Sequence, residues 1–83
     1  MVLKNDMNVI DYDIKQKVGK NIRYYRLQKG LTQINLAKLT GLRQTYISEV
    51  ERGKINISIL NINLISESLD VPVYILFLDD YIS

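Results

Sequence analysis

Apolar residues in the first third of the chain recur every three or four positions, which is typical of a helix with one buried face. This stripe consists of Ile14, Val18, Ile22 and Tyr25. The predicted helix begins at Asp11 or Asp13, because Asp13 and Gln16 have the spacing of a capping box. Gly30 supplies a cap at its other end. Residues 1–10 have no clear period, and we expect them to form an N-terminal arm.

Two short helices joined by a glycine turn follow, at about residues 33–39 and 44–52. Thr32 can cap the first of them through its hydroxyl, and Gly41 can end it in the left-handed conformation. Gly53 ends the second helix. Their apolar stripes consist of Leu36, Ala37 and Leu39, and of Ile47 and Val50. Two short helices with such a turn between them predict a helix-turn-helix.

Two further helices are predicted, the fourth capped by Ser58 and the fifth starting at Pro72. Apolar residues surround so much of the fourth helix that we expect it to be central to the core: Ile59, Leu60, Ile62, Leu64, Ile65 and Leu69. The fifth is apolar nearly all round: Val73, Ile75, Leu76, Phe77 and Leu78. A terminal helix on so small a domain cannot bury every face, so residues 72–82 are predicted to form the dimer interface. The alternative is a helix that only plugs the core.

The pattern as a whole predicts an all-α fold of five helices in one domain, residues 11–83. There is no cysteine and no histidine, which excludes disulfides and thiolate or imidazole metal sites and removes the commonest general base. Neither paired carboxylates nor a glycine-rich phosphate loop are present, so we expect no enzyme and no cofactor. No signal peptide or apolar run of about 18 residues is found, which predicts a cytoplasmic protein without a membrane segment.

Charge is distributed unevenly, although the net charge is only +2. Residues 15–54 carry ten lysines and arginines against two glutamates, a net of +8. Residues 55–83 carry four acidic residues and no basic one. The positive part of the chain is also the part with the helix-turn-helix, as expected of a surface that binds a polyanion. Ordinary solvated helix faces are the alternative interpretation.

The central segment resembles the lambda-repressor-like (Xre-type) family of DNA-binding domains. Its key positions are matched by Gln33, Ala37, Gly41, Ile47 and Val50, within Leu31-Thr32-Gln33 and Glu51-Arg52-Gly53. Within that family, Thr45-Tyr46-Ile47-Ser48 and Asn56-Ile57-Ser58 resemble the controller proteins of restriction–modification systems. The resemblance implies a five-helix domain whose second and third helices form the helix-turn-helix. It also implies a buried ion pair between Arg26 and Glu51 that ties the first helix to the third.

The recognition helix of such a domain enters the major groove by its N-terminal end. Arginine can bind guanine O6 and N7, glutamine can bind adenine N6 and N7, and glutamate can accept from cytosine N4. The predicted base-contacting residues are Arg43, Gln44, Thr45 and Glu49. Arg43 occupies the helix cap, where it forgoes about 1 kcal/mol of capping. Controllers usually have an acidic or polar residue there and arginine one place later.

Phosphate contacts are expected from the start of the second helix, from the loop after the third and from nearby cations. The predicted residues are Gln33, Tyr46, Arg52, Lys54, Asn56, Ser58, Arg23 and Lys38. The alternative for Tyr46 is packing against the second helix, and for the two last cations a solvated surface.

These observations favour a homodimeric regulator that binds a near-palindromic double-stranded DNA operator. The resemblance implies a controller that times endonuclease expression and regulates its own gene, with RNA polymerase as a candidate partner. The alternatives are a phage-type repressor and an antitoxin-like protein-interaction module. We expect no small-molecule effector, since effector-responsive regulators carry an additional ligand-binding domain.

Overall fold

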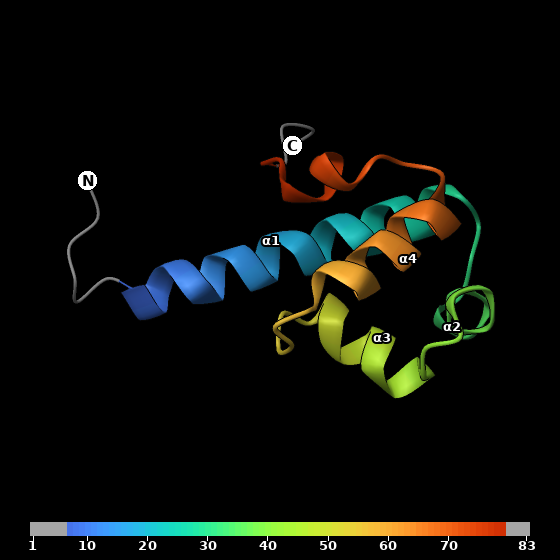
Figure 1. Ribbon diagram of the computed structural model, residues 1–83, viewed down its shortest axis with the longest axis horizontal. Coiled ribbons are helices and arrows are strands. Elements are labelled where there is room, and N and C mark those ends of the chain that lie inside the picture. The colour runs from blue at the N-terminus through green and yellow to red at the C-terminus, as the bar shows by residue number, and fades with distance from the viewer. Residues whose placement is uncertain (1–6, 80–83) are drawn as a thin grey trace.

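A computed structural model describes residues 7–79, with side chains from residue 14 onward. In this range the chain forms four α-helices and a 3-10 helix, without a strand: α1 (Met7–Gln28), α2 (Gln33–Thr40), α3 (Gln44–Glu51), α4 (Ile59–Leu69) and η2 (Val73–Phe77). In Figure 1, α1 crosses the molecule, with α4 along its second half, α2 and α3 below and η2 above. The all-α prediction is confirmed.

The first helix begins earlier than the sequence predicted. α1 starts at Met7, ahead of Asp11 and Asp13, so that Asp13 lies inside the helix and cannot form a capping box. Gln16, the other residue of the predicted box, instead donates from Nε2 to the backbone oxygen of Arg52 at 3.2 Å. The predicted arm is thus partly helical, and its first six residues lie outside the described range. Although α1 is long, neither it nor another described helix is apolar enough to cross a membrane.

Local capping signals determine where the next helices begin and end. The Thr32 hydroxyl accepts from the Asn35 N–H at 3.0 Å, and the Thr32 N–H donates to Asn35 Oδ1 at 3.1 Å, a reciprocal capping box. Gly41 ends α2 with a φ of 78°, the left-handed conformation. Ser58 caps α4 by accepting from the Asn61 N–H at 3.1 Å. The predicted helix-turn-helix is therefore confirmed within one residue at each helix end.

The core receives side chains from all five elements. Its buried apolar residues are Val18, Ile22, Leu36, Ile47, Val50, Ile62, Ile65, Leu69 and Leu76. The prediction that α4 is central to the core holds for one face of the helix, which buries Ile62, Ile65 and Leu69, but not for its start, where Ile59 and Leu60 are 84% and 77% exposed. Leu39, predicted on the buried face of α2, is also exposed. α4 therefore packs along one face only and presents large apolar side chains to solvent.

Gly19 marks the closest approach of α1 and the end of α3. A Cβ atom built at Gly19 would overlap the carbonyl oxygen of Val50 and lie 2.7 Å from that of Glu51. The absence of a side chain therefore lets the two backbones come into contact, which explains a glycine that costs an isolated helix up to about 1 kcal/mol relative to alanine. α1 thus fixes the C-terminal end of α3.

The predicted fifth α-helix is wrong over the described residues 72–79, because η2 is a single five-residue 3-10 helix. The Ile75 N–H donates to the carbonyl three residues earlier, the pattern of a 3-10 turn. Asn21 of α1 then donates from Nδ2 to the carbonyl oxygens of Leu76 at 2.9 Å and Leu78 at 2.8 Å. Leu78 is extended. A side chain of α1 therefore satisfies backbone acceptors that the next turn of an α-helix would have used.

Candidate nucleic-acid interface

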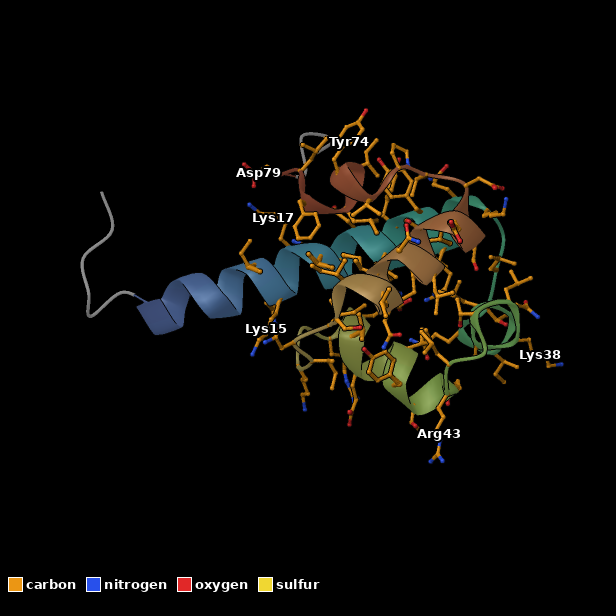
Figure 2. The ribbon with its side chains drawn as sticks, viewed as in Figure 1. Lys15, Lys17, Lys38, Arg43, Tyr74 and Asp79 are labelled. Atoms are coloured by element: carbon orange, nitrogen blue, oxygen red, sulfur yellow. The ribbon has the colours of Figure 1, made fainter. Side chains whose placement is uncertain are left out.

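The N-terminal end of α3 forms an exposed edge of the molecule. Ile47 and Val50 are buried and anchor one face of this helix in the core. On the other side Arg43, Gln44 and Thr45 are exposed, and Figure 2 shows Arg43 pointing away from the body. A B-DNA major groove about 12 Å wide admits one α-helix. The edge can therefore present three polar side chains to base edges.

Arg43 occupies the N-cap position of α3 without acting as a cap. Its backbone is extended, with φ −73° and ψ 145°, and its side chain makes no capping hydrogen bond. The guanidinium also lies at the positive end of the helix dipole, which disfavours a cation. Glu49, one turn further along, is exposed as well. An anion placed at this end of α3 would be attracted by both the helix terminus and Arg43.

Arg26 and Glu51 form the buried ion pair that the resemblance implies. Arg26 Nε lies 2.6 Å from Glu51 Oε2 and Nη2 lies 3.0 Å from Oε1, a two-pronged contact from α1 to the end of α3. The side chains are 8% and 3% exposed. Arg26 Nη1 also donates to the Leu31 carbonyl at 2.8 Å. The pair therefore joins α1, α3 and the segment that leads into α2.

Two glutamines extend this ion pair to the surface. Gln33, the first residue of α2, donates from Nε2 to Glu51 Oε1 at 3.1 Å. Gln44, the first residue of α3, donates from Nε2 to Gln33 Oε1 at 2.8 Å. The sequence predicted separate roles for these residues, phosphate contact for Gln33 and base contact for Gln44, and no contact between them. Separations of 18 and 11 residues leave no local pattern that would have indicated the contacts.

Tyr46 connects α3 to α4. Its phenol oxygen accepts a hydrogen bond from Asn61 Nδ2 at 3.0 Å, and the ring is half-buried. The contact lies with α4, which the sequence analysis did not predict for this residue. The phenol proton can still be donated to an acceptor outside the protein.

The other residues predicted to contact phosphate are also accessible. Exposed positions are occupied by Arg23, Lys38, Arg52, Lys54, Asn56 and Ser58. In Figure 2 Lys38 points outward from α2 on the same lower side of the molecule as Arg43. The Ser58 hydroxyl oxygen is engaged as the cap of α4, so only its proton can be offered to phosphate.

The apolar residues predicted for the dimer interface differ in accessibility. Leu76 is fully buried within the domain and cannot supply contact area to a partner. Phe77 and Leu78 are 43% and 44% exposed, and Val73 and Ile75 are half-buried. The predicted segment also includes residues 80–82, which lie outside the described residues.

α4 adds apolar surface that the sequence analysis assigned to the core. Ile59 and Phe77 line one hollow of about 120 Å³ together with Ile14 of α1, so the exposed ends of α4 and η2 face a common depression. Leu60 follows Ile59 on the surface. The exposed apolar surface is therefore formed by α4 and η2 with Ile14 of α1, rather than by the last element alone.

The chain matches a family model described as helix-turn-helix over residues 22–76, more than half of its length. It belongs to the lambda-repressor-like (Xre-type) helix-turn-helix family, whose members are DNA-binding transcription regulators and not enzymes. The matched segment contains every residue of the Arg26, Glu51, Gln33 and Gln44 network.

Among its relatives are restriction–modification controllers. The control protein C.SmaI of Serratia marcescens is 34% identical over 68 residues, which are 82% of this chain and 81% of that protein. The solved structure of the controller protein C.AhdI from Aeromonas hydrophila superposes with a TM-score of 0.77 at 41% identity, covering 80% of this chain and all of that one.

A hypothetical transcription factor of Neisseria meningitidis is 38% identical over 68 residues, or 82% of this chain. The match spans 64% of that factor, slightly less than two thirds of its length. These comparisons confirm the resemblance described from the sequence.

Proposed function

We propose that this DNA-binding regulator acts as a homodimer that recognises a specific, near-palindromic operator and controls a restriction–modification system. The observation that carries the proposal is the polar N-terminal edge of α3, held in place by hydrogen bonds that begin at a buried ion pair. Side chains fixed in this way select a base sequence at a low cost in conformational entropy.

In the proposed complex α3 enters the major groove by its N-terminal end. Arg43, Gln44 and Thr45 contact base edges, and Glu49 accepts from a cytosine amino group one turn along. Tyr46 donates its phenol proton to a phosphate or a base edge. The exposure of the first four and the free proton of the last support these roles.

Phosphate contacts bracket this base-reading edge in the proposed complex. They come from Gln33 at the start of α2, from the exposed loop after α3, and from the outward cations Arg23 and Lys38. The loop residues are Arg52, Lys54, Asn56 and Ser58. Such contacts set the register of the protein on the duplex and make its affinity strongly dependent on salt.

Dimerisation uses the surface shared by α4 and η2. Exposed Ile59, Leu60, Phe77 and Leu78 make up its centre, and Val73 and Ile75 lie at its margin. Leu76 is buried beneath η2 and makes no contact with the partner. A two-fold axis through this surface would have to hold the two α3 helices about 34–36 Å apart, one turn of DNA.

The restriction–modification role is supported by the similarity to C.SmaI and to C.AhdI. The match to C.AhdI covers the full length of that chain. In this role the protein binds upstream of its own gene and times the expression of the endonuclease, with RNA polymerase as the partner of an activating complex. Neighbouring methyltransferase and endonuclease genes would distinguish this role from that of a phage-type repressor.

A gel-shift titration tests the proposal on DNA from directly upstream of the gene, with a scrambled duplex of equal length as control. We expect tight binding to the upstream DNA only, and a logarithmic affinity that falls with the logarithm of salt by about 0.9 per phosphate contact. Equal, weak binding to both duplexes would contradict sequence-specific regulation.

A further inference from the structure

We propose that Lys15, near the start of α1, binds a phosphate of the operator backbone and so adds the first helix to the DNA-binding surface. The inference rests on the proposed DNA-binding function and deepens it. Lys15 is not among the predicted phosphate contacts, and it precedes residues 22–76, the segment that the family model matches. The contact therefore does not follow from membership of the family.

Lys15 lies on the face of α1 that packs against the C-terminal end of α3. Lys15, Gly19 and Arg26 follow one another at helical spacing and share this face. The Gly19 backbone lies against the carbonyl oxygens of Val50 and Glu51. Arg26 is bonded to the Glu51 carboxylate. Because Lys15 comes one turn before Gly19, it extends past the end of α3 and lies beside the loop that follows.

This loop is held directly against the start of α1. Gln16 donates from Nε2 to the backbone oxygen of Arg52 at 3.2 Å. A Cβ atom built at Gly53 would lie 3.0 Å from the Cα atom of Gln16, so the two backbones approach closely here. Lys15 and Asn56 line the same hollow of about 120 Å³. Lys15 and the loop that is proposed to contact phosphate therefore form one surface.

The charge of Lys15 is available to an anion. The residue is half-buried in the hollow, and it makes no hydrogen bond or ion pair with the residues that the structure describes. None of the described residues that line the hollow is acidic. A lysine packs its aliphatic stem on apolar surface and keeps its ammonium group in water. Binding an anion here therefore breaks no ion pair and orders little of the side chain.

The side of α1 on which Lys15 lies is the side that is proposed to face DNA. Figure 2 shows Lys15 on the lower side of α1, toward which Arg43 and Lys38 also point. Lys17, two residues later, points to the upper side, where it is paired with Asp79. Lys15 thus continues a row of cations along one side of the molecule. Such a row favours a strand of phosphates over a single small anion.

Lys15→Met tests the contact, because it removes the ammonium group and keeps an apolar side chain for the hollow. Each dimer would lose two phosphate contacts, so the slope of logarithmic affinity against logarithmic salt should become shallower by about 1.8. From about 200 mM to about 50 mM salt, the loss of affinity relative to the wild type should grow about 12-fold. Fluorescence anisotropy on the upstream operator measures both. The loss should be equal on operators with single base-pair replacements, since the backbone carries no base identity.

Lys20→Met is the matched control. Lys20 is an exposed cation of the same helix, five residues after Lys15 and therefore about 140° around the helix from it. The two variants have the same net charge, but Lys20→Met should keep the wild-type slope. Lys15→Arg, which retains a cation at the proposed contact, should keep it as well. Circular dichroism shows that each variant is folded.

The possible failures are distinguishable. A wild type that binds the operator and a scrambled duplex equally overturns the proposed function and the Lys15 contact with it. A wild type that selects the operator overturns the contact alone if Lys15→Met keeps the wild-type slope, or if Lys15→Met and Lys20→Met lower it equally.

Sedimentation velocity of the variants addresses dimerisation, because Lys15 shares the hollow with Ile59 and Phe77. We expect Lys15→Met to dimerise like the wild type. A variant that dimerises differently but keeps the wild-type slope would assign Lys15 to the dimer surface and overturn the DNA contact.

Acetylation of the wild-type protein tests the contact without a variant. With operator bound, the Lys15 amine should react with acetic anhydride several-fold more slowly than in the free protein at the same concentration, because a phosphate covers it. Lys20 should react equally in both states. Mass spectrometry of the digested protein measures each rate. Equal reactivity of Lys15 with and without operator would overturn the contact.

Discussion

α3 begins after Arg43, whose side chain makes no capping hydrogen bond, whereas α4 begins after Ser58, whose hydroxyl caps its helix. The residues that follow the two caps also differ in polarity. The first turn of α3 is polar, while α4 starts with Ile59 and Leu60, two of the most exposed apolar residues among those described. Each helix thus has a feature that lowers the stability of the isolated domain: α3 lacks a side-chain cap, and α4 exposes large apolar side chains.

The two departures match two different partners. An uncapped helix terminus carrying a cation attracts an anion, as phosphate-lined DNA provides. Large apolar side chains on an otherwise well-capped helix gain by being covered by another apolar surface. We therefore infer that the N-terminal end of α3 binds DNA, and that the exposed apolar start of α4, the α4 edge, binds a second copy of this chain. The following substitutions test the two assignments separately.

We expect the largest loss of stability from Arg26→Ala, which removes the ion pair that joins α1 to the C-terminal end of α3. The change strands the Glu51 carboxylate in the core, and removing one partner of a buried pair costs about 3–5 kcal/mol. Urea denaturation at fixed protein concentration measures it. Arg23→Ala, one turn earlier and exposed, is the control and should stay within about 0.5 kcal/mol of the wild type. Wild-type stability for Arg26→Ala would show that the pair has no structural role.

Ile59→Asp should break the α4 edge without harming the fold. A carboxylate in the first turn of a helix is favoured by the dipole, but it cannot be buried against an apolar partner. We expect the dimer dissociation constant to rise by about 30-fold or more, the size of a hot-spot effect. Sedimentation velocity over a concentration series measures it.

Ile34→Asp is the control for this substitution, since it places the same charge near the start of α2. Ile34 is an exposed apolar residue outside the α4 and η2 surface, so its variant should dimerise normally. A dimer unaffected by Ile59→Asp, or weakened equally by both changes, would remove the assignment of α4.

Ser58→Ala and Arg43→Ser should shift stability in opposite directions by smaller amounts. Removing the α4 cap costs about 1 kcal/mol, and supplying a cap to α3 gains up to about 1 kcal/mol. Thermal unfolding measures both changes.

Arg43→Ser should nevertheless weaken operator binding, measured by fluorescence anisotropy, because it removes a cation from the edge that we propose faces DNA. Arg43→Ser that is more stable and binds equally well would leave Arg43 without a role in DNA binding.

The sequence predicted the helix-turn-helix more accurately than either end of the chain. Thr32, Gly41 and Ser58 act within three or four residues of themselves, so their local spacing is sufficient to place α2 and α4. The start of α1 was wrong because Asp13 and Gln16 imitate a capping box inside a helix that continues past them.

The wrong or missing predictions concern interactions between distant residues. η2 is a short 3-10 turn rather than an α-helix, and at its end Asn21, 55 residues before Leu76, donates to the Leu76 carbonyl oxygen. The glutamine bonds at the start of α3 likewise join residues that no periodicity relates. The exposed start of α4 escaped prediction because an apolar residue has the same pattern whether the domain or a partner covers it.

The contact at Gly19 also affects how firmly the N-terminal end of α3 is held. The backbone carbonyl oxygens of Val50 and Glu51 lie against the Gly19 backbone, so a methyl group at residue 19 would push the C-terminal end of α3 away from α1. Because α3 is a short rigid helix, displacing its C-terminal end also shifts its N-terminal end, where Gln44 lies. The absence of a side chain where the two helices cross therefore helps to set the position of Gln44, about two helical turns away, which we propose contacts a base.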